Sequence, residues 1–279
     1  MIIDFHTHTF PDRIADVAVD KLKHASHTVP FSDGTAQGLT LSMKRAGVDL
    51  SVVMPVATNP GKTSSINDAS FQFSGRNGLL YFGAIHPDTP NAVDEMARIA
   101  QMGIRGVKIH PVYQNVRIDD PRFLRILEKA GELDLLVTTH AGEDIGFPGV
   151  SRCSPEMIAR ALSIVGPVKL ICAHMGGWRD WKRAADCLAH TSAMIDTAFS
   201  LGNLTPLEKD FYSEEQLHML SEESFCLLVR AFGAKRVLFG SDSPWANQGR
   251  EIAAIRALPL TQEEKEDILG ENARRLLGL

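Results

Sequence analysis

Two histidines stand two residues apart in the opening stretch of the sequence, MIIDFHTHTF. A β-strand places residues i and i+2 on the same face, so a strand here presents the imidazoles of His6 and His8 side by side. Neutral imidazole is a common ligand of zinc and related divalent metals. The pair therefore predicts two metal ligands supplied by one strand.

Further histidines follow other apolar runs of the sequence. Six of the ten histidines end such runs, namely His6, His8, His86, His110, His140 and His174. Any one of them could be a packing residue, but packing gives no reason to prefer the ends of runs. Asp242 ends the last run, and imidazoles completed by a carboxylate can hold a catalytic metal with an open position for water. We therefore expect a metal centre.

The elements that must position these residues are eight short β-rich runs. They cover residues 1–6, 50–56, 79–87, 106–111, 135–142, 168–177, 192–198 and 236–244. Their nearly continuous apolar character is typical of parallel strands buried on both faces. Amphipathic stretches separate most of them. Helix starts are expected at Asp120-Pro121 and Ser154-Pro155, because Asp or Ser caps a helix and Pro suits its first turn.

Eight strands with helical crossovers in 279 residues predict an α/β fold, a (β/α)8 TIM barrel forming a single domain over residues 1–279. A doubly wound open sheet is the alternative, weakened because no GxGxxG follows the first run. In a barrel the strand ends meet at one face, which would gather the histidines and Asp242. Two long segments, 11–45 and 199–232, fit the alternation poorly and are expected to be loops or lids that shape the substrate site.

The composition favours a small-molecule enzyme. The chain carries a net charge of −5 without a basic run, so neither a nucleic acid nor an anionic membrane is an expected partner. No apolar run approaches the roughly 20 residues of a membrane span, and no secretory signal is evident. The four cysteines form no CxxC motif, which favours reduced thiols and a cytoplasmic location. A homodimer is the expected assembly only on base rates.

The ordered motifs DFHTH, VTTHAGE, CAHMGG and FGSDSPW resemble the amidohydrolase superfamily. Within it, the sequence is most similar to the amidohydrolase-2 group, metal-dependent TIM-barrel hydrolases related to aminocarboxymuconate-semialdehyde decarboxylase. The resemblance implies that His6, His8, His140 and Asp242 bind the metal. It also implies that His174 acts beside the metal-bound water, and that Asp242 accepts the proton of that water.

The fourth run, GVKIHP, leaves the number of metal ions open. By the same resemblance, a carboxylated Lys108 could bridge a second ion bound by His140 and His174. Alternatively, an unmodified Lys108 supports the site or binds an anionic substrate. One ion is favoured over two. Zinc is the first expectation for a ligand set of histidines and carboxylate, with manganese or iron as substitutes.

Several residues near these motifs are candidate substrate contacts: His110, Tyr113, Trp178 and Arg179. Arg179 could pair with a substrate carboxylate, although a surface Arg at a helix start is the commoner role. Glu143 and Asp144 are expected in a solvated loop, or else in support of His140. The expected reaction is hydrolysis of an amide, lactone or ester by a metal-activated water, with non-oxidative decarboxylation on the same site as the alternative.

Overall fold

Parallel strands and intervening helices form the computed structural model of this protein, which describes residues 1–279. The chain divides into two units. The first comprises Met1–Val53, Ile145–Pro148 and Asp196–Leu279, and the second comprises Met54–Asp144 and Gly149–Ile195. The α/β class predicted from the sequence is confirmed. The extent of the domain stays a prediction.

The second unit carries a parallel sheet. The strands of this sheet are β4 (Gly83–Ala84), β5 (Gly106–Ile109), β6 (Leu136–Thr139), β7 (Lys169–Cys172) and the start of β8 (Met194–Asp196). The unit also holds β3 (Leu79–Tyr81), which is not part of this sheet. Strands β4 to β8 pair in chain order. All residues of β5 and β6 are buried, which explains why these runs read as continuously apolar.

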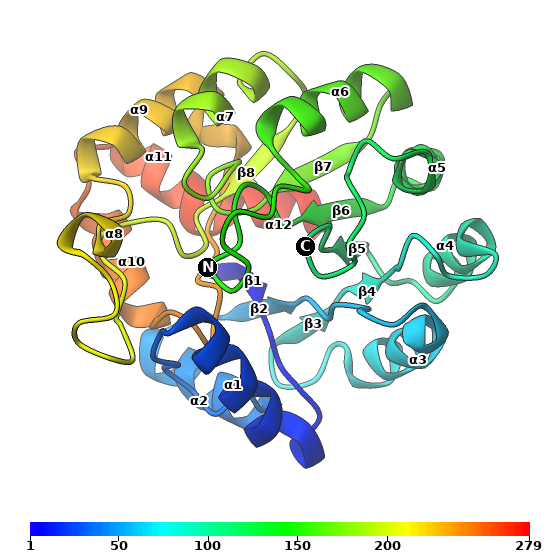
Figure 1. The fold of residues 1–279 in the computed structure, drawn as a ribbon, viewed down its shortest axis with the longest axis horizontal. Helices are drawn as coiled ribbons and strands as arrows, with labels where there is room; N and C mark the ends of the chain where they lie inside the picture. The colour runs from blue at the N-terminus through cyan, green and yellow to red at the C-terminus, as the bar shows by residue number, and fades with distance from the viewer. The chain divides into compact units, whose positions relative to one another are not determined.

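Helices cover the sheet of the second unit. They are η1 (Pro60–Lys62), α3 (Thr63–Phe73), α4 (Ala92–Gln101), α5 (Pro121–Glu132), α6 (Pro155–Val165) and α7 (Trp181–Leu188). Figure 1 shows α5 and α6 lying outside strands β5, β6 and β7. The Asp120 carboxylate accepts a hydrogen bond from the Arg122 amide, and the Ser154 hydroxyl accepts one from the Met157 amide. Both helix starts predicted from the sequence are confirmed.

The first unit begins with strands β1 (Ile3–Thr7) and β2 (Leu50–Val53), which pair in parallel, and it also holds β9 (Val237–Leu238). Just beyond β9, the Phe239 carbonyl accepts a hydrogen bond from the Phe5 amide. The helical elements of this unit are α1 (Asp12–Ser26), α2 (Ala36–Ala46), α8 (Glu214–Leu217), α9 (Glu222–Phe232), η2 (Ala234–Arg236), α10 (Gln248–Ala257), α11 (Gln262–Glu266), η3 (Asp267–Glu271) and α12 (Asn272–Leu277).

The two long segments that are predicted to shape the substrate site are partly helical. Residues 11–45 contain α1 and most of α2, and residues 199–232 contain α8 and α9 after an irregular stretch. Backbone hydrogen bonds tie the two segments together, from Val29 to Thr205 (3.0 Å) and from Leu207 to His27 (2.8 Å). Whether these segments shape the substrate site as loops or lids stays a prediction.

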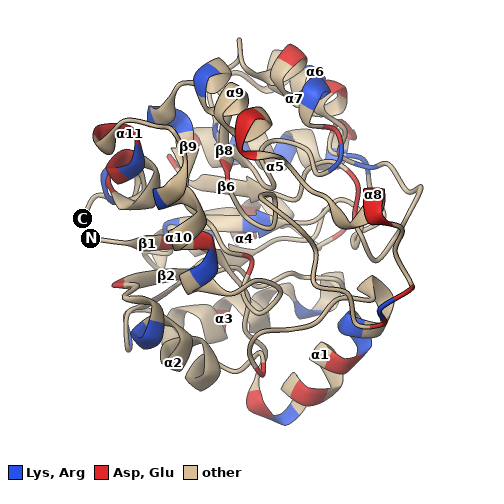
Figure 2. Ribbon diagram, turned by 90° about the vertical axis from the view of Figure 1, so that its left-hand side faces the viewer, with Lys and Arg blue, Asp and Glu red and all other residues tan.

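Charged residues of both signs alternate on the helices. Figure 2 shows acidic and basic residues interspersed along α1 and α11, in keeping with the absence of a basic run in the sequence. No helix is both long enough and apolar enough to cross a membrane.

Candidate metal centre

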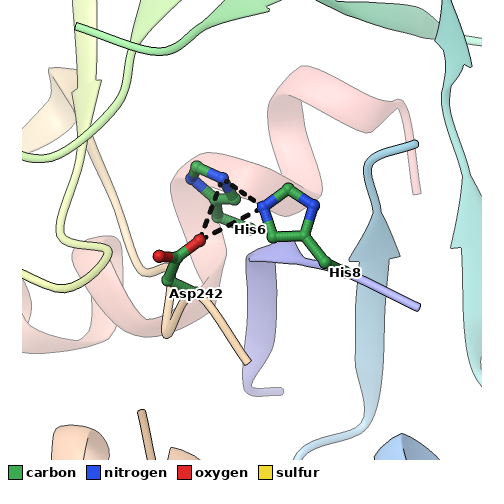
Figure 3. A group of neighbouring side chains, drawn as sticks. All are labelled: His6, His8 and Asp242. Atoms are coloured by element: carbon green, nitrogen blue, oxygen red, sulfur yellow. Dashed lines mark hydrogen bonds and ion pairs between the residues drawn. The ribbon is translucent and has the colours of Figure 1, made fainter. Parts of the chain in front are cut away.

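Three side chains of the first unit converge on one point (Figure 3). His6 Nε2 lies 3.2 Å from His8 Nε2 and 3.4 Å from Asp242 Oδ1, and His8 Nε2 lies 3.2 Å from the same oxygen. Tetrahedral zinc with bonds of about 2.0–2.1 Å holds neighbouring ligand atoms about 3.4 Å apart. The spacing therefore fits a divalent metal, and the three predicted ligands are brought together.

Asp196 fixes the orientation of His6. Its Oδ2 lies 2.8 Å from His6 Nδ1, and neither side chain is exposed. Because an ionised carboxylate only accepts, the proton of the imidazole stays on Nδ1 and the lone pair of Nε2 is directed at His8 and Asp242. Asp196 Oδ1 also accepts a hydrogen bond from the Ala198 amide (3.1 Å). The Asp196 carboxylate thus has two roles: it orients the candidate metal ligand His6, and it caps the turn after β8 through the Ala198 amide.

The backbone brings the end of β1 against the segment after β9. The Asp242 amide donates to the His6 carbonyl (2.8 Å), and the His8 amide donates to the Ser243 carbonyl (2.7 Å). Asp242 itself has φ +65°, a left-handed conformation that a non-glycine residue adopts only when the surroundings hold it there. Gly240 allows this close approach, because a Cβ atom at that position would lie 2.7 Å from the Cβ of His6.

A buried carboxylate, Asp4, supports the same junction. It accepts hydrogen bonds from the Ser241 amide (2.9 Å), the Ser241 hydroxyl (2.6 Å) and the Gln248 side chain (2.7 Å). Complete burial raises the pKa of Asp4 to about 6, although these hydrogen bonds favour its ionised form. The network joins β1 to the turn that carries Asp242 and to the first residue of α10.

The second unit gathers another set of predicted residues. His110 Nε2 lies 3.4 Å from Asp144 Oδ2, and His140 Nε2 lies 3.9 Å from the same oxygen. The rings of His110 and His140 stack at 4.3 Å, and His140 Nδ1 lies 3.1 Å from His174 Nε2. All four side chains are buried. His110, His140 and His174 therefore form one continuous cluster, and three of its groups, His110, His140 and Asp144, are also spaced as metal ligands can be.

The expectation of a solvated position was wrong for Asp144, which is only 6% exposed, whereas Glu143 is exposed. Backbone hydrogen bonds explain the difference. The Glu143 amide donates to the Trp178 carbonyl (3.0 Å), and the Trp178 amide donates to the Ala141 carbonyl (2.9 Å). These bonds fold the residues after β6 back so that Asp144 faces His110. Sequence reasoning missed the contact of Asp144 with His110, whereas the alternative role of Asp144 beside His140 agrees with the 3.9 Å between Asp144 Oδ2 and His140 Nε2.

The remaining predicted residues also lie in the second unit. Lys108 is buried within β5, at 1% exposure. Tyr113 stacks on His110 with the ring centres 3.8 Å apart. The Arg179 guanidinium lies over the rings of Trp178 (4.7 Å) and Trp181 (6.0 Å), and its backbone has φ +65°. The Arg179 guanidinium thus contacts the rings of Trp178 and Trp181. The positive φ of Arg179 shows that its backbone is held in a conformation that non-glycine residues rarely adopt.

One strand-end histidine, His86, joins neither cluster. Its Nδ1 accepts a hydrogen bond from the Asp88 amide (3.1 Å), and burial lowers its pKa. His86 therefore caps a turn. It has a structural role, as any one of the six histidines that end apolar runs could have had.

Comparison with known proteins shows the family and the fold of the chain. Residues 3–279 match the family profile described as Amidohydrolase, and no curated protein matches. Among solved structures, the chain is similar to 5-carboxyvanillate decarboxylase from Sphingomonas paucimobilis (16% identity, 100% of this chain and 99% of that chain, TM-score 0.69). It is also similar to 2,6-dihydroxybenzoate decarboxylase from Rhizobium (16% identity, 99% and 98%, TM-score 0.69) and to an uncharacterised TIM-barrel protein from Bordetella bronchiseptica (17% identity, 99% and 98%, TM-score 0.74).

At these identities the structural likenesses show the fold, and the predicted TIM-barrel class is confirmed over the full length. The family match covers nearly every residue, from the strand with the histidine pair to the last helix. The chain therefore belongs to the amidohydrolase-2 family.

Proposed function

We propose that this protein is a metal-dependent enzyme that removes the carboxylate of a small carboxylic acid without oxidation. The observation that carries the proposal is the tight group of His6, His8 and Asp242, present in a member of a metal-dependent enzyme family. Similarity to two decarboxylases over the full length supports decarboxylation ahead of the hydrolysis expected first from the sequence. Hydroxylated benzoates, the class named for those two proteins, are the first substrates to test.

The metal would be held by His6, His8 and Asp242. His6 Nε2 and Asp242 Oδ1 are acceptor atoms 3.4 Å apart, and His8 Nε2 lies 3.2 Å from both, so a cation bound among the three would be favoured by all of them. When bound, the ion supplies a positive charge that polarises a substrate oxygen or lowers the pKa of water. We propose that the metal is zinc. We also propose His140 as a further ligand, because it lies at a strand end as His6 and His8 do.

The chain's own residues must manage one proton. In decarboxylation the bond between the carbon skeleton and the carboxylate breaks, CO2 leaves, and the remaining carbon takes up a proton. We propose Asp242 and His174 as the acid and base groups that handle this proton. Asp242 is 8% exposed and its second oxygen, Oδ2, is not among the converging ligand atoms, whereas His174 is held at 3.1 Å from His140.

Substrate recognition is assigned to the second unit. Arg179, held over the faces of Trp178 and Trp181, would pair with a substrate carboxylate that is not lost in the reaction. We propose Tyr113, which stacks on His110, as the contact for an aromatic substrate ring, and His110 as a polar contact.

Hydrolysis of an amide, lactone or ester is the second candidate. It is favoured by the description of the family as amidohydrolases and by the burial of Lys108 within β5. A buried lysine that becomes carboxylated could bridge a second ion, as the family resemblance implies.

The test is a direct assay of both reactions. Metal-loaded protein is incubated with 2,6-dihydroxybenzoate and 5-carboxyvanillate while CO2 is measured, and with a panel of lactones and aryl esters while hydrolysis is measured. We expect CO2 release that His6→Ala and Asp242→Asn abolish, with exposed His24→Ala as the matched control. Hydrolysis of a lactone or ester without any CO2 release would replace this proposal with the second candidate.

A further inference from the structure

A cavity lies in the first unit beside the turn that carries Asp242, since the amide of its lining residue Trp245 donates to the Asp242 carbonyl (2.8 Å). It measures about 300 Å³, the lower end of the range for small-molecule sites. Helix α10 and the segment from residue 199 to residue 219 contribute most of its lining residues. None of its twelve lining residues is a candidate metal ligand or lies in the second unit. We call it the accessory pocket.

One wall of the accessory pocket is aromatic. Phe31, Phe199 and Trp245 contribute three rings from three separate segments, and Leu201 and Met219 add aliphatic surface. Aromatic faces accept both other rings and organic cations. The guanidinium of Arg250 already lies 5.7 Å from the centre of the Phe31 ring while Arg250 itself is exposed. The Phe31 ring thus already makes a cation–π contact at the edge of the pocket.

A carboxyl group lines the same pocket without a partner. Glu251 makes no side-chain hydrogen bond and no ion pair, and it lies on the first turns of α10. Burial and the nearby Asp4 raise its pKa to about 8, while Arg250 lowers it. A carboxylate in such surroundings is stabilised by any positive group that reaches it, because the cost of its desolvation is then offset.

We propose that the accessory pocket binds a small aromatic amine, with the ring among Phe31, Phe199 and Trp245 and the ammonium group on Glu251. The rings supply apolar contact and cation–π attraction, and the carboxylate supplies a charge-assisted hydrogen bond. A neutral ligand of the same shape would use only the first of these contributions. Asp4 and Arg250 are the charged groups that act on Glu251, and neither forms an ion pair with it.

Isothermal titration of the full-length protein with 2-phenylethylamine tests this proposal, with 2-phenylethanol as the neutral probe of nearly equal shape. We expect saturable binding of the amine at pH 7 and an affinity at least tenfold lower for the alcohol. Because the ammonium group favours ionised Glu251, amine binding should release a proton, seen as a heat that depends on the ionisation enthalpy of the buffer. The alcohol should release none.

Two variants and a control make the test specific. Glu251→Gln should weaken amine binding at least tenfold and remove the proton release, whereas Glu263→Gln, an exposed glutamate on α11, should change neither. Ala254→Phe should fill the pocket and abolish binding of both probes. Absence of saturable amine binding, or equal affinity in wild type and Glu251→Gln, would overturn the proposal. Neither result would bear on the proposed decarboxylation, since these residues take no part in it.

Discussion

The hydrogen bond between Asp196 and His6 makes a quantitative prediction. In Asp196→Asn the side chain keeps its size but loses its charge. Because an amide can donate to His6 Nδ1 as well as accept from it, the proton of the imidazole is no longer held on Nδ1. The bond is 2.8 Å long and both groups are fully buried, so solvent cannot replace it. Losing such a partner of a metal-bound histidine typically lowers metal affinity about 10- to 100-fold, or about 1.4–2.7 kcal/mol.

The assay is a competition for zinc between the protein and a chelator of known affinity, carried out on wild type and variant. Excess metal should restore most of the activity of Asp196→Asn, because the three ligands themselves are intact. Asp210→Asn, which changes an exposed aspartate of the same unit, is the matched control and should bind metal like wild type. Unchanged metal affinity in Asp196→Asn would refute the conclusion that this carboxylate orients His6.

Three further predictions follow from individual contacts. Gly240→Ala should destabilise the fold by about 1–3 kcal/mol in chemical unfolding, because its Cβ would lie 2.7 Å from that of His6, whereas Gly61→Ala, with 3.4 Å to its nearest neighbour, should cost less. Glu251 has a pKa raised from 4.5 to about 8, so the folded state keeps a proton that the unfolded state has lost. The free energy of unfolding should therefore fall by a few kcal/mol as the pH rises from 4.5 to 8, and Glu251→Gln should remove that slope; a slope unchanged in the variant would contradict the assignment. Arg179→Gln should raise KM for a dicarboxylate substrate about tenfold or more with little change in metal content, and an unaltered KM would exclude Arg179 as the carboxylate contact.

The sequence predicted those parts of the site that depend on regular structure. His6 and His8 share a face because a strand repeats every two residues, and Asp242 follows an apolar run typical of a buried strand. The helix starts at Asp120 and Ser154 were also predictable, because a capping residue followed by proline favours a helix start through contacts within the first turn.

Parts of the site that depend on how loops fold back were not predictable. Asp144 is buried only because backbone hydrogen bonds hold residues 141–143 against Trp178, and no periodicity reports such a contact. The raised pKa of Glu251 was not predictable either. A glutamate on the first turns of a helix is normally solvated, but here Glu251 lines a cavity together with residues of the segment 199–219, and burial and Asp4 raise its pKa.

Metal content is the measurement that tests the central claim most directly. Elemental analysis of protein purified without added chelator should find about one divalent ion per chain, unchanged in Lys108→Ala and lost in His6→Ala. Two ions that fall to one in Lys108→Ala would instead indicate a carboxylated bridging lysine and favour hydrolysis. A full complement of metal in His6→Ala, or none in wild type even after incubation with zinc, manganese or iron, would contradict the metal centre at His6, His8 and Asp242.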